Sequence, residues 1–489
     1  MSRSRRRFLV ESAVASAALL HPGLRSFAAG GKAKAKSPFL EGNFAPLRKE
    51  FTEEKLPVTG TLPKGLNGLF VRNGPNPQFD PLGNYHWFDG DGMLHGVRLR
   101  DGVASYRNRS IETTGFLEEK KAGKALYKGM QDIPDLKKVA EGKNPFKNPA
   151  NTALVYHSDK LLALWEGGEP YEIEVPGLGT VGPQTFGGKL KHPFTAHPKV
   201  DPATGEMLAF GYIPTKPLAL FSTFDKTGKL LRTAPITLPH ASMIHDFAIT
   251  ENFALFPACP QTFEMKRMFT GQSPWYFDKD KPTTWVLVPR DGKAKPQNFE
   301  AKTCFAFHLL NAWEDGDDVI VVGCRYSRFP GALAIGEADD KNESNASVPY
   351  KWTLNRKTGK VAEEAIDKLA AEFPRHHDGF VGRKLQYGYF GIGDGEFFGG
   401  LRKWDLTTGK GIDHTYGDGM FGGEGVFVPK PGGKKEDEGW LMTFVYDKAN
   451  DKSHLTIIDA GDVSAKPVAT IQLPTRVPYG FHGTWVAGV

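Results

Sequence analysis

The sequence predicts an all-β fold of the β-propeller class, and three observations support this prediction. Short apolar runs of strand length alternate with turns along the 489-residue chain, which contains 56 glycines and 35 prolines. The turns DPATGE, DKTGK, NRKTGK and DLTTGK repeat one pattern, in which Asp or Asn and Gly separate β-branched or aromatic runs. No long segment has the 3.6-residue period of an amphipathic helix. Small antiparallel units repeated over roughly 450 residues fit a propeller of about six to eight blades.

The first element, residues 1–29, is predicted to be a twin-arginine signal peptide. SRRRFL is followed by a short apolar stretch through Leu20 and by the small residues SFAA. This leader would be recognised by the twin-arginine export machinery, which exports folded proteins to the periplasm; a disordered basic tail is the alternative. The N-terminal residue of the mature protein would distinguish the two. A linker, residues 30–39, and a single domain, residues 40–489, complete the predicted organisation.

The basic charge of the chain is concentrated in this leader. Residues 1–36 contain eight of the 62 Lys and Arg residues and only one of the 56 acidic ones. The body is therefore close to neutral, although the whole chain carries a formal charge of +6. A near-neutral body lacks the basic surface of nucleic-acid-binding proteins, so no nucleic-acid partner is expected.

The body consists mainly of predicted strands, with two short helices expected at Leu126–Glu141 and Val361–Ala371. The clearest strands are LLALW, MLAFGYI, ALFPA, VIVVGCR and HLTIIDAG. The cysteines Cys259, Cys304 and Cys324 form no CxxC pair and lie in apolar runs, so they are predicted to be buried thiols.

Four single histidines lie far apart in apolar, strand-like surroundings. They are His197 in FTAHPKVD, His245 in SMIHDFAIT, His308 in CFAFHLLNAW and His482 in YGFHGTW. Imidazole is a common metal ligand and is costly to bury without a partner. A propeller gathers the innermost strand of each blade around one axis, so one histidine per blade could meet there at a metal ion. The alternative is that each is a separate, satisfied core residue, since the chain has fourteen histidines.

Three glutamates lie in contexts that suggest burial. Glu166 follows LLALW, Glu372 precedes Phe-Pro, and Glu424 lies in FGGEGVFVP. A metal-bound imidazole normally donates its other N–H to a carboxylate or a carbonyl group, which fixes the ring. These glutamates are therefore candidates for orienting the histidines, and turn capping is the alternative.

A series of motifs covers the body in order and begins at LFVRNGPNPQFDPLGNYHWFDGDGML. It continues through NTALVYHSDKLLALWEGGEPY, FTAHPKVDPATGE, MIHDFAIT, FHLLNAWEDGDD, EFPRHHDGFVGRKLQYGY, GGEGVFVPKP and YGFHGTW. In these motifs the chain resembles the carotenoid cleavage oxygenases, a family of enzymes that cleave double bonds of carotenoids, apocarotenoids and stilbenes.

This resemblance implies a seven-bladed β-propeller with a dome of loops and short helices over its top face, and one Fe(II) ion on its axis. The family's iron ligands fall on His197, His245, His308 and His482, and its three supporting glutamates on Glu166, Glu372 and Glu424. The implied activity is that of a non-haem iron dioxygenase. It would add O2 across one C=C bond of a carotenoid or apocarotenoid to give two carbonyl products.

Two residues depart from the family's pattern, and a third bears on the substrate. Gly425 stands where proline is usual, and Gln386 stands where arginine is usual. Stilbene cleavers of the family carry a lysine immediately before the first glutamate, whereas this chain has Trp165. A tryptophan offers an apolar wall to a polyene and cannot take a phenolic proton. It therefore favours a carotenoid-type substrate over the alternative, a stilbene; a non-catalytic binding propeller is the second alternative.

The dome of this family usually contacts a membrane. Peripheral membrane contact is therefore expected through Phe269–Phe277 or Leu126–Phe146, an ordinary exposed loop being the alternative. The segment Asp89–Gly92 lacks the spacing of a calcium loop, so a structural tight turn is predicted there.

Overall fold

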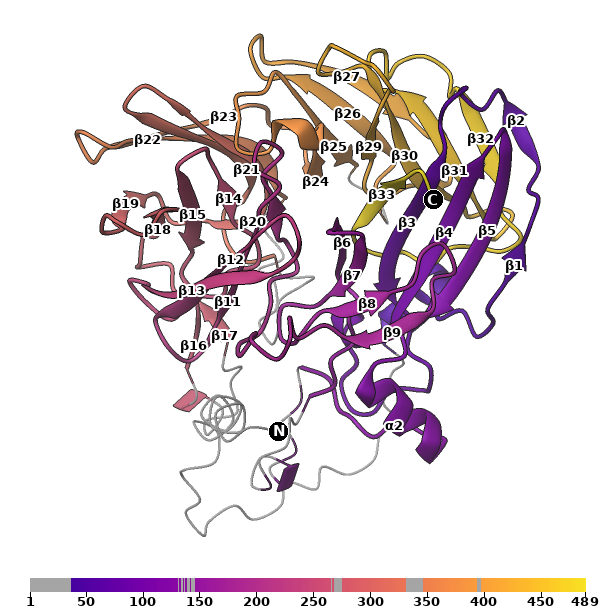
Figure 1. Cartoon of the computed structure of the whole chain (residues 1–489), viewed down its shortest axis with the longest axis horizontal. Helices are drawn as coiled ribbons and strands as arrows, with labels where there is room; N and C mark the ends of the chain where they lie inside the picture. Colours follow the sequence, from indigo (N-terminus) through magenta and orange to yellow (C-terminus); the bar gives the residue numbers. More distant parts are fainter. Residues whose placement is uncertain are drawn as a thin grey trace.

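Most of the chain folds into antiparallel strands joined by the turns that the sequence marks. The computed structural model describes residues 37–489, apart from residues 131, 133–134, 136, 139–140, 142–145, 265, 268–274, 331–345 and 394–396. The predicted signal peptide and most of the linker lie outside the described residues. The described strands form seven sheets arranged as blades around one axis (Figure 1) and one two-stranded sheet outside them, and the prediction of a seven-bladed propeller is confirmed.

The strands of each blade follow one another from the axis outwards. Blade 1 comprises β33 (Gly483–Ala487), β3 (Gly68–Pro75), β4 (Gly92–Arg100), β5 (Val103–Ser110) and β1 (Thr52–Glu53). Blade 2 comprises β6 (Ala153–His157), β7 (Lys160–Leu164), β8 (Tyr171–Ile173) and β9 (Thr180–Pro183). Blade 3 comprises β10 (Lys199–Val200), β11 (Met207–Tyr212), β12 (Leu218–Phe224) and β13 (Leu230–Thr237). Blade 4 comprises β14 (Ala248–Ile249), β15 (Phe253–Ala258), β18 (Thr283–Pro289) and β19 (Gln297–Ala301).

The remaining blades have the same plan. Blade 5 comprises β20 (Phe305–Asp315), β21 (Asp318–Tyr326), β22 (Val348–Asn355) and β23 (Val361–Ala365). Blade 6 comprises β24 (Ala371–Arg375), β25 (Tyr387–Ile392), β26 (Gly400–Asp405) and β27 (Lys410–Thr415). Blade 7 comprises β28 (Met420–Phe421), β29 (Val426–Pro429), β30 (Gly439–Asp447), β31 (Lys452–Asp459), β32 (Ala469–Gln472) and β2 (Val58–Gly60). Outside the blades, β16 (Gln261–Phe263) pairs with β17 (Trp275–Phe277).

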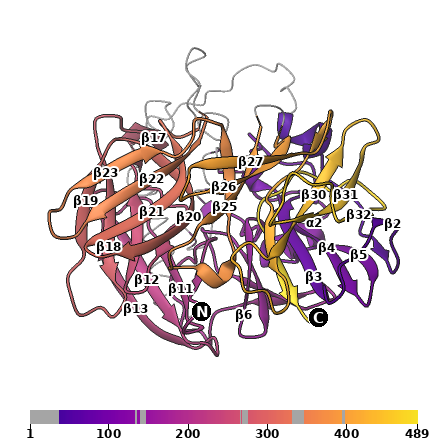
Figure 2. The same cartoon turned by 90° about the horizontal axis from the view of Figure 1, so that it is seen from above.

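The ring is closed where the two ends of the body meet. β33 pairs with β3 as the innermost strand of blade 1, and β2 pairs with β32 at the outer edge of blade 7. Figure 2 shows β3 to β5 beside β30 to β32 at this seam. Strands from both ends of the sequence therefore hold the first and last blades together.

The hydrophobic core is divided among the interfaces between blades. Seven buried clusters each join one pair of neighbouring blades. Between blades 4 and 5, for example, the rings of Trp285 and Trp352 lie 5.1 Å apart and are fully buried. All three cysteines are buried free thiols, as predicted.

The two ends of the propeller differ in the length of their connections. The strands of a blade, counted from the axis outwards, alternate in direction. The links from the second to the third strand and the links from one blade to the next therefore lie at the same end of the propeller. The long links 76–91, 111–152 and 259–282 lie there. The tight turns 101–102 and 158–159 lie at the other end. An eighth buried cluster consists of aromatic residues, including Trp87, and lies at the end with the long links; it is called the eighth aromatic cluster below.

One of the two helix predictions is wrong, and one helix was not predicted. Val361–Ala371 contains the edge strand β23, because Leu354 to Tyr350 of β22 pair with Val361 to Ala365, and an ion pair joins Lys351 to Glu364. Pairing overrides the helical propensity of this segment. Within Leu126–Glu141, the described residues Lys137 and Lys138 are helical.

The α-helix α2 (Thr114–Ala122) carries sequence signals that identify it. Thr113 accepts a hydrogen bond from the backbone N–H of Phe116, and Gly123 ends the helix with a φ of 66°. Threonine before a helix and glycine after it are typical caps. Short 3-10 turns occur at η1 (Pro38–Leu40), η2 (Gly42–Phe44), η3 (Trp87–Asp89) and η6 (Asp378–Phe380).

Candidate metal centre

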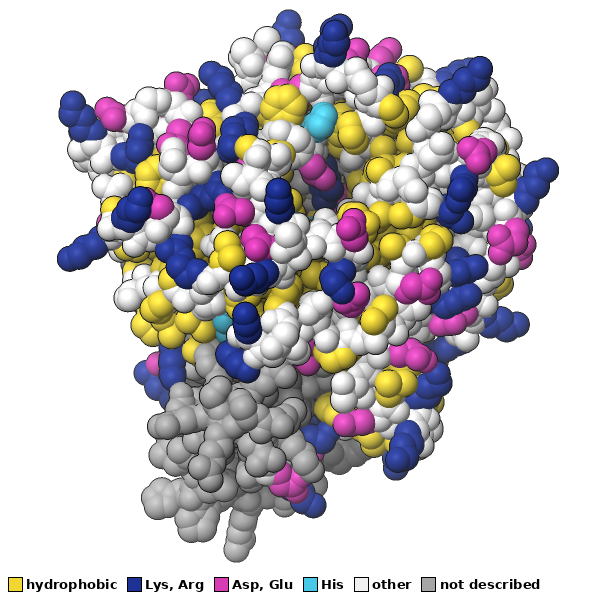
Figure 3. All heavy atoms as spheres, in the orientation of Figure 1, with side chains coloured by type: hydrophobic (Ala, Val, Ile, Leu, Met, Phe, Trp, Pro, Cys, Tyr) yellow, Lys and Arg dark blue, Asp and Glu magenta, His cyan; other side chains and the backbone are white. Residues whose placement is uncertain are grey.

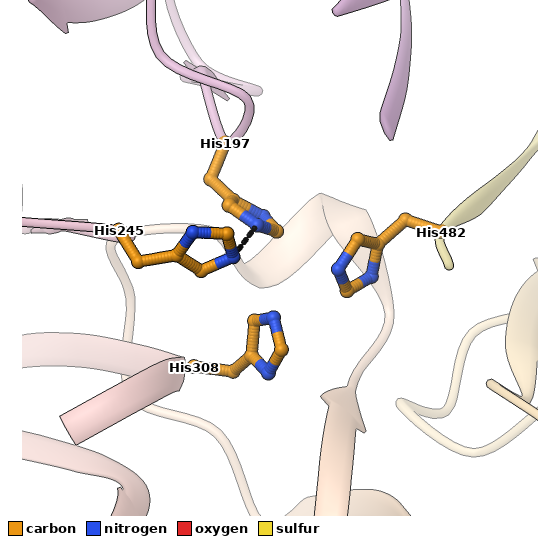
Figure 4. Close-up of side chains that lie close together, drawn as sticks. All are labelled: His197, His245, His308 and His482. Carbon is orange, nitrogen blue, oxygen red and sulfur yellow. Dashed lines mark hydrogen bonds between the residues drawn. The ribbon is translucent and has the colours of Figure 1, made fainter. Parts of the chain in front are cut away.

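Four histidines converge at the propeller axis (Figure 4). His197, His245 and His482 lie just before the innermost strands β10, β14 and β33, and His308 lies near the start of β20. One nitrogen from each ring can be chosen so that all four lie within 4.8 Å of one another. These are the four histidines that the sequence singled out.

Every blade of the propeller contributes one polar side chain to the candidate metal centre. The histidines come from blades 1, 3, 4 and 5, and the three predicted glutamates come from the other blades. Glu166 follows the second strand of blade 2, Glu372 lies in β24 of blade 6, and Glu424 precedes β29 of blade 7. The start of each first strand and the end of each second strand lie at the same end of a blade, so all seven residues reach the same level.

Each glutamate accepts a hydrogen bond from one histidine. Nδ1 of His245 lies 2.6 Å from Oε2 of Glu166, and Nδ1 of His308 lies 2.6 Å from Oε2 of Glu372. Nδ1 of His482 lies 2.9 Å from Oε1 of Glu424. When Nδ1 carries the proton, Nε2 keeps a free lone pair. These bonds therefore select the tautomer in which Nε2 can bind a metal.

Backbone irregularities turn two of these side chains towards the axis. The pairing of β20 with β21 shifts register between Ala306 and Leu309, around His308. The pairing of β24 with β25 shifts between Glu372 and Arg375, and Phe373 has a φ of 52°. Consecutive strand residues normally point to opposite faces. In β24, however, Glu372 and Phe373 both contact His308, which an undistorted strand would not allow.

Burial favours the neutral imidazole at two of the four histidines, His197 and His308. It lowers the pKa of His197 and His308 well below the ordinary value, and the neighbouring histidines lower both further. A neutral imidazole is the form that binds a cation, whereas an imidazolium cannot.

The glutamates differ in charge environment. Burial raises the pKa of Glu372 to about 7, against hydrogen bonds from the backbone of Phe373 and from Tyr326. Burial acts on Glu424 in the same direction, but Arg375 and hydrogen bonds from His482 and Gly483 prevail and lower its pKa to about 2. The carboxylate of Glu424 is thus the firmly ionised member of these two.

The donor set fits a divalent transition metal. Nε2 of His308 is buried and has no hydrogen-bond partner in the structure, although a buried polar atom normally has one. Nε2 of His197 and Nε2 of His245 lie 3.0 Å apart. Two metal–nitrogen bonds of about 2.1 Å at a right angle would place the nitrogens about 3.0 Å apart. Imidazole ligands suit iron, zinc, copper and nickel.

Aromatic rings enclose the histidines. The ring of Phe307 lies 4.3 Å from that of His245, and the ring of Phe373 lies 4.9 Å from that of His482. Phe373 belongs to the eighth aromatic cluster, with Trp87, Phe481 and others. The metal centre therefore faces an apolar aromatic region on the side of the long connections.

Trp165 lies beside the backbone of Gly167. A Cβ atom at Gly167 would collide with the indole ring of Trp165. The side chain of Trp165 is partly exposed, and it precedes Glu166 at the same end of blade 2.

Three residues that support the glutamates were missed by the sequence reasoning, and one of them is Tyr326, which donates a hydrogen bond to Glu372. The buried hydroxyl of Tyr212 donates to Oε1 of Glu166 at 2.8 Å, and Nη1 of Arg375 lies 3.6 Å from Oε1 of Glu424. Tyr212 is distant in sequence from its partner, so no local signal marks it. Arg375, three residues after Glu372, could have been suspected as a buried counter-charge.

Residues 89–92, where a tight turn is predicted, link the end of η3 at Asp89 to the start of β4 at Gly92, and Asp91 between them belongs to a buried ion network. Nζ of Lys147 lies 2.7 Å from Oδ1 of Asp91 and 2.7 Å from Oε2 of Glu119. Asp89 accepts hydrogen bonds from the backbone N–H groups of His86 and Met130. These carboxylates thus hold neighbouring protein groups, as the structural interpretation expects.

Comparison with known proteins identifies the family. The family model of the retinal pigment epithelial membrane protein matches residues 44–487. Carotenoid 9,10(9',10')-cleavage dioxygenase 1 of Arabidopsis thaliana is 41% identical over 483 residues, covering 92% of this chain and 89% of the relative. The 9-cis-epoxycarotenoid dioxygenase NCED6 of the same plant is 35% identical, with 92% of this chain and 81% of the relative covered.

Solved structures agree with this relationship. The lignostilbene dioxygenase of Pseudomonas brassicacearum superimposes with a TM-score of 0.85 at 29% identity, over 93% of this chain and 99% of that one. A variant of the Synechocystis apocarotenoid oxygenase gives a TM-score of 0.82 at 31% identity, over 90% and 97%. The predictions of the family and of a dioxygenase are confirmed. The chain therefore belongs to the retinal pigment epithelial membrane protein family, the family of the carotenoid cleavage dioxygenases.

Proposed function

We propose that this protein is an iron(II)-dependent dioxygenase that cleaves one C=C bond of a carotenoid or apocarotenoid, using one O2 to form two carbonyl groups. The observation that carries the proposal is the four-histidine cluster, buried beneath aromatic rings in a member of this family. Among the described residues it is the one group of three or more potential ligands close enough to hold a metal ion.

Iron(II) bound by the four histidines would supply the activation of O2. The protein's part is to hold the imidazoles in place, and the glutamates do so through Nδ1 of His245, His308 and His482. Since imidazole binds a metal as a neutral ligand, the glutamates would also provide the negative charge that offsets the cation. A cobalt-substituted form of the Synechocystis oxygenase is among the similar solved structures, which makes cobalt a suitable spectroscopic substitute for iron.

The aromatic surroundings suit a long apolar substrate. Phe307 and Phe373 contact the histidines, and Phe373 continues into the eighth aromatic cluster. Such rings bind a polyene by dispersion and exclude water from the reacting bond. Trp165, in place of the lysine expected for a stilbene cleaver, favours the carotenoid-type substrate.

A substrate panel tests the proposal. Iron-loaded protein is expected to convert carotenoids or apocarotenals into pairs of shorter aldehydes or ketones, identified by mass spectrometry, and to leave 4-hydroxystilbenes such as resveratrol unchanged. The second candidate substrate is a stilbene, because a lignostilbene dioxygenase is among the similar structures. Cleavage of stilbenes alone would reverse the order of the two candidates. An iron-loaded protein that turns over neither class would contradict both candidate substrates.

We also propose peripheral membrane contact at the end with the long connections. Leu82, Leu117 and Leu126 are exposed there, and Lys120 and Lys121 lie in the last turn of α2. No described helix has both the length and the apolar composition needed to cross a membrane. The exposed leucines at this end would give most of the affinity through apolar contact. On the face drawn in Figure 3, basic and acidic side chains are interspersed.

Liposome flotation checks this contact. The Leu117→Ser/Leu126→Ser variant is expected to lose most of its binding to phosphatidylglycerol-containing vesicles, because two exposed apolar side chains are removed. Leu231→Ser is the matched control, since Leu231 is equally apolar and exposed on β13. Unchanged flotation of the double variant, or equal loss in the control, would remove the proposed contact.

A further inference from the structure

The carboxylate of Asp246 is shared among three chain segments. Asp246 follows His245 directly and is buried. Its Oδ1 accepts hydrogen bonds from Nζ of Lys199 at 2.8 Å and from the backbone N–H of Phe247 at 2.7 Å. Its Oδ2 accepts one from the backbone N–H of Leu309 at 2.9 Å. Both oxygens are therefore occupied by donors from different places in the sequence.

Each of these segments carries a histidine of the metal centre. Lys199 lies two residues after His197, and Leu309 lies one residue after His308. The carboxylate thus connects the inner strands of blades 3, 4 and 5. No backbone ladder joins the described strands of these blades to one another, so apolar packing and side-chain bonds together set the relative positions of the segments.

The bond to Leu309 lies at the bulge of β20. Leu309 is where the pairing with β21 shifts register, and its buried N–H requires an acceptor. Asp246 supplies this acceptor and so fixes the distorted backbone that carries His308. The ion pair with Lys199 neutralises the buried carboxylate, whose side chain is 3% exposed.

In its described contacts, His197 lacks the carboxylate partner that the other three histidines have. His245, His308 and His482 each bind a glutamate. The segment of His197 is joined to that of His245 by the Lys199–Asp246 ion pair.

We propose that Asp246 is a positioning residue that fixes the segments of His197, His245 and His308 relative to one another and thereby sets the affinity and geometry of the metal site. This inference rests on the proposed binding of a metal by the four histidines.

The variant Asp246→Asn tests it with little change in volume. The amide has one acceptor oxygen and a donor NH2 group. In either orientation, the NH2 group faces an N–H or the ammonium group, and Lys199 loses its counter-ion. We expect binding of Co(II), measured by competition with a chelator, to weaken by about 10–100-fold. We also expect a changed ligand-field absorption spectrum of the cobalt protein.

Two further variants separate positioning from general stability. Lys199→Met removes the ion pair of Asp246 and keeps its hydrogen bonds to the backbone of Phe247 and Leu309, so a smaller loss of Co(II) affinity is expected. If Asp246→Asn does not fold, Lys199→Met serves as the test in its place. Asp437→Asn is the control, because Asp437 bonds Lys403 at 2.7 Å between blades 6 and 7, away from the histidines. It is expected to bind Co(II) as the wild type does.

The outcomes distinguish this inference from the proposed function. Folded Asp246→Asn and Lys199→Met proteins that bind Co(II) as the wild type does, with its spectrum, would overturn the role of Asp246 alone. The role of Asp246 would also be overturned if Asp437→Asn lost as much Co(II) affinity as Asp246→Asn. A wild-type protein that takes up no metal would overturn the metal centre and this inference together.

Discussion

Replacing His308 with alanine is expected to leave the protein without a bound metal and without dioxygenase activity. Nε2 of His308 is buried, has no partner within the protein, and faces the other imidazoles (Figure 4). Its removal leaves three ligands and also deprives Glu372 of its hydrogen-bond donor. Metal content after dialysis and the rate of polyene cleavage measure the effect. The metal-to-protein ratio is expected to fall from about one to near zero.

Two comparisons sharpen this result. Glu372→Gln keeps all four histidines and weakens the hold on one of them, so metal affinity should fall by only about 10–100-fold. His414→Ala removes an equally buried histidine on β27, whose Nδ1 bonds the carbonyl oxygen of Val463. It should cost some stability and keep its metal. If His308→Ala retained a full equivalent of metal, the four-histidine site would be ruled out.

Replacing Lys147 with methionine is expected to destabilise the protein by about 3–5 kcal/mol, because it leaves uncompensated buried charge. Lys147 bonds both Asp91 and Glu119, and each of these carboxylates is 2% exposed. The network joins the segment after β3, helix α2 and the connection to β6, so much of the long connections should loosen. Denaturant unfolding measures the loss of stability.

The pH dependence gives this prediction a second readout. Burial raises the pKa of Asp91 even beside Lys147. When the folded-state pKa of a carboxyl group is raised, protonation favours the fold, and stability is lost as the pH rises through that pKa. The deficit of Lys147→Met should therefore shrink as the pH is lowered. Lys120→Met, which breaks an exposed pair with Glu112, should cost roughly 0–1 kcal/mol. Equal effects of the two variants would contradict the role of the buried network.

Local signals marked the histidines and glutamates of the metal centre as candidates, and the family resemblance then selected them. His308 lies in an apolar run, and a histidine there needs a partner to be buried. The residues that hold these side chains could not be found in the same way. Tyr212 reaches Glu166 across 46 residues, and Asp246 reaches Leu309 across 63. Such contacts depend on how blades pack, which a single sequence does not encode locally.

The errors in secondary structure have a physical cause. Val361–Ala365 has a composition that suits a helix, but hydrogen bonds to β22 are available at a blade edge and decide its conformation. Helix α2 was overlooked although Thr113 and Gly123 mark its ends, because its apolar face is narrow: Phe116 is buried, but Leu117 is exposed. The number of blades came from the family resemblance, since the spacing of the turns alone was compatible with about six to eight blades.

The closure of the ring has a consequence for the order of assembly. β33 follows His482 directly and pairs with β3, and Arg72 of β3 donates a hydrogen bond to the carbonyl group of Pro478 across 406 residues of sequence. Contacts of such long range require the closure of a very long loop, which costs conformational entropy. A chain in which this seam is still open has at most three of the four histidines in place. Metal uptake would therefore report that the ring of blades has closed. A bound ion would in turn stabilise the closed ring by mass action and so oppose opening at this seam.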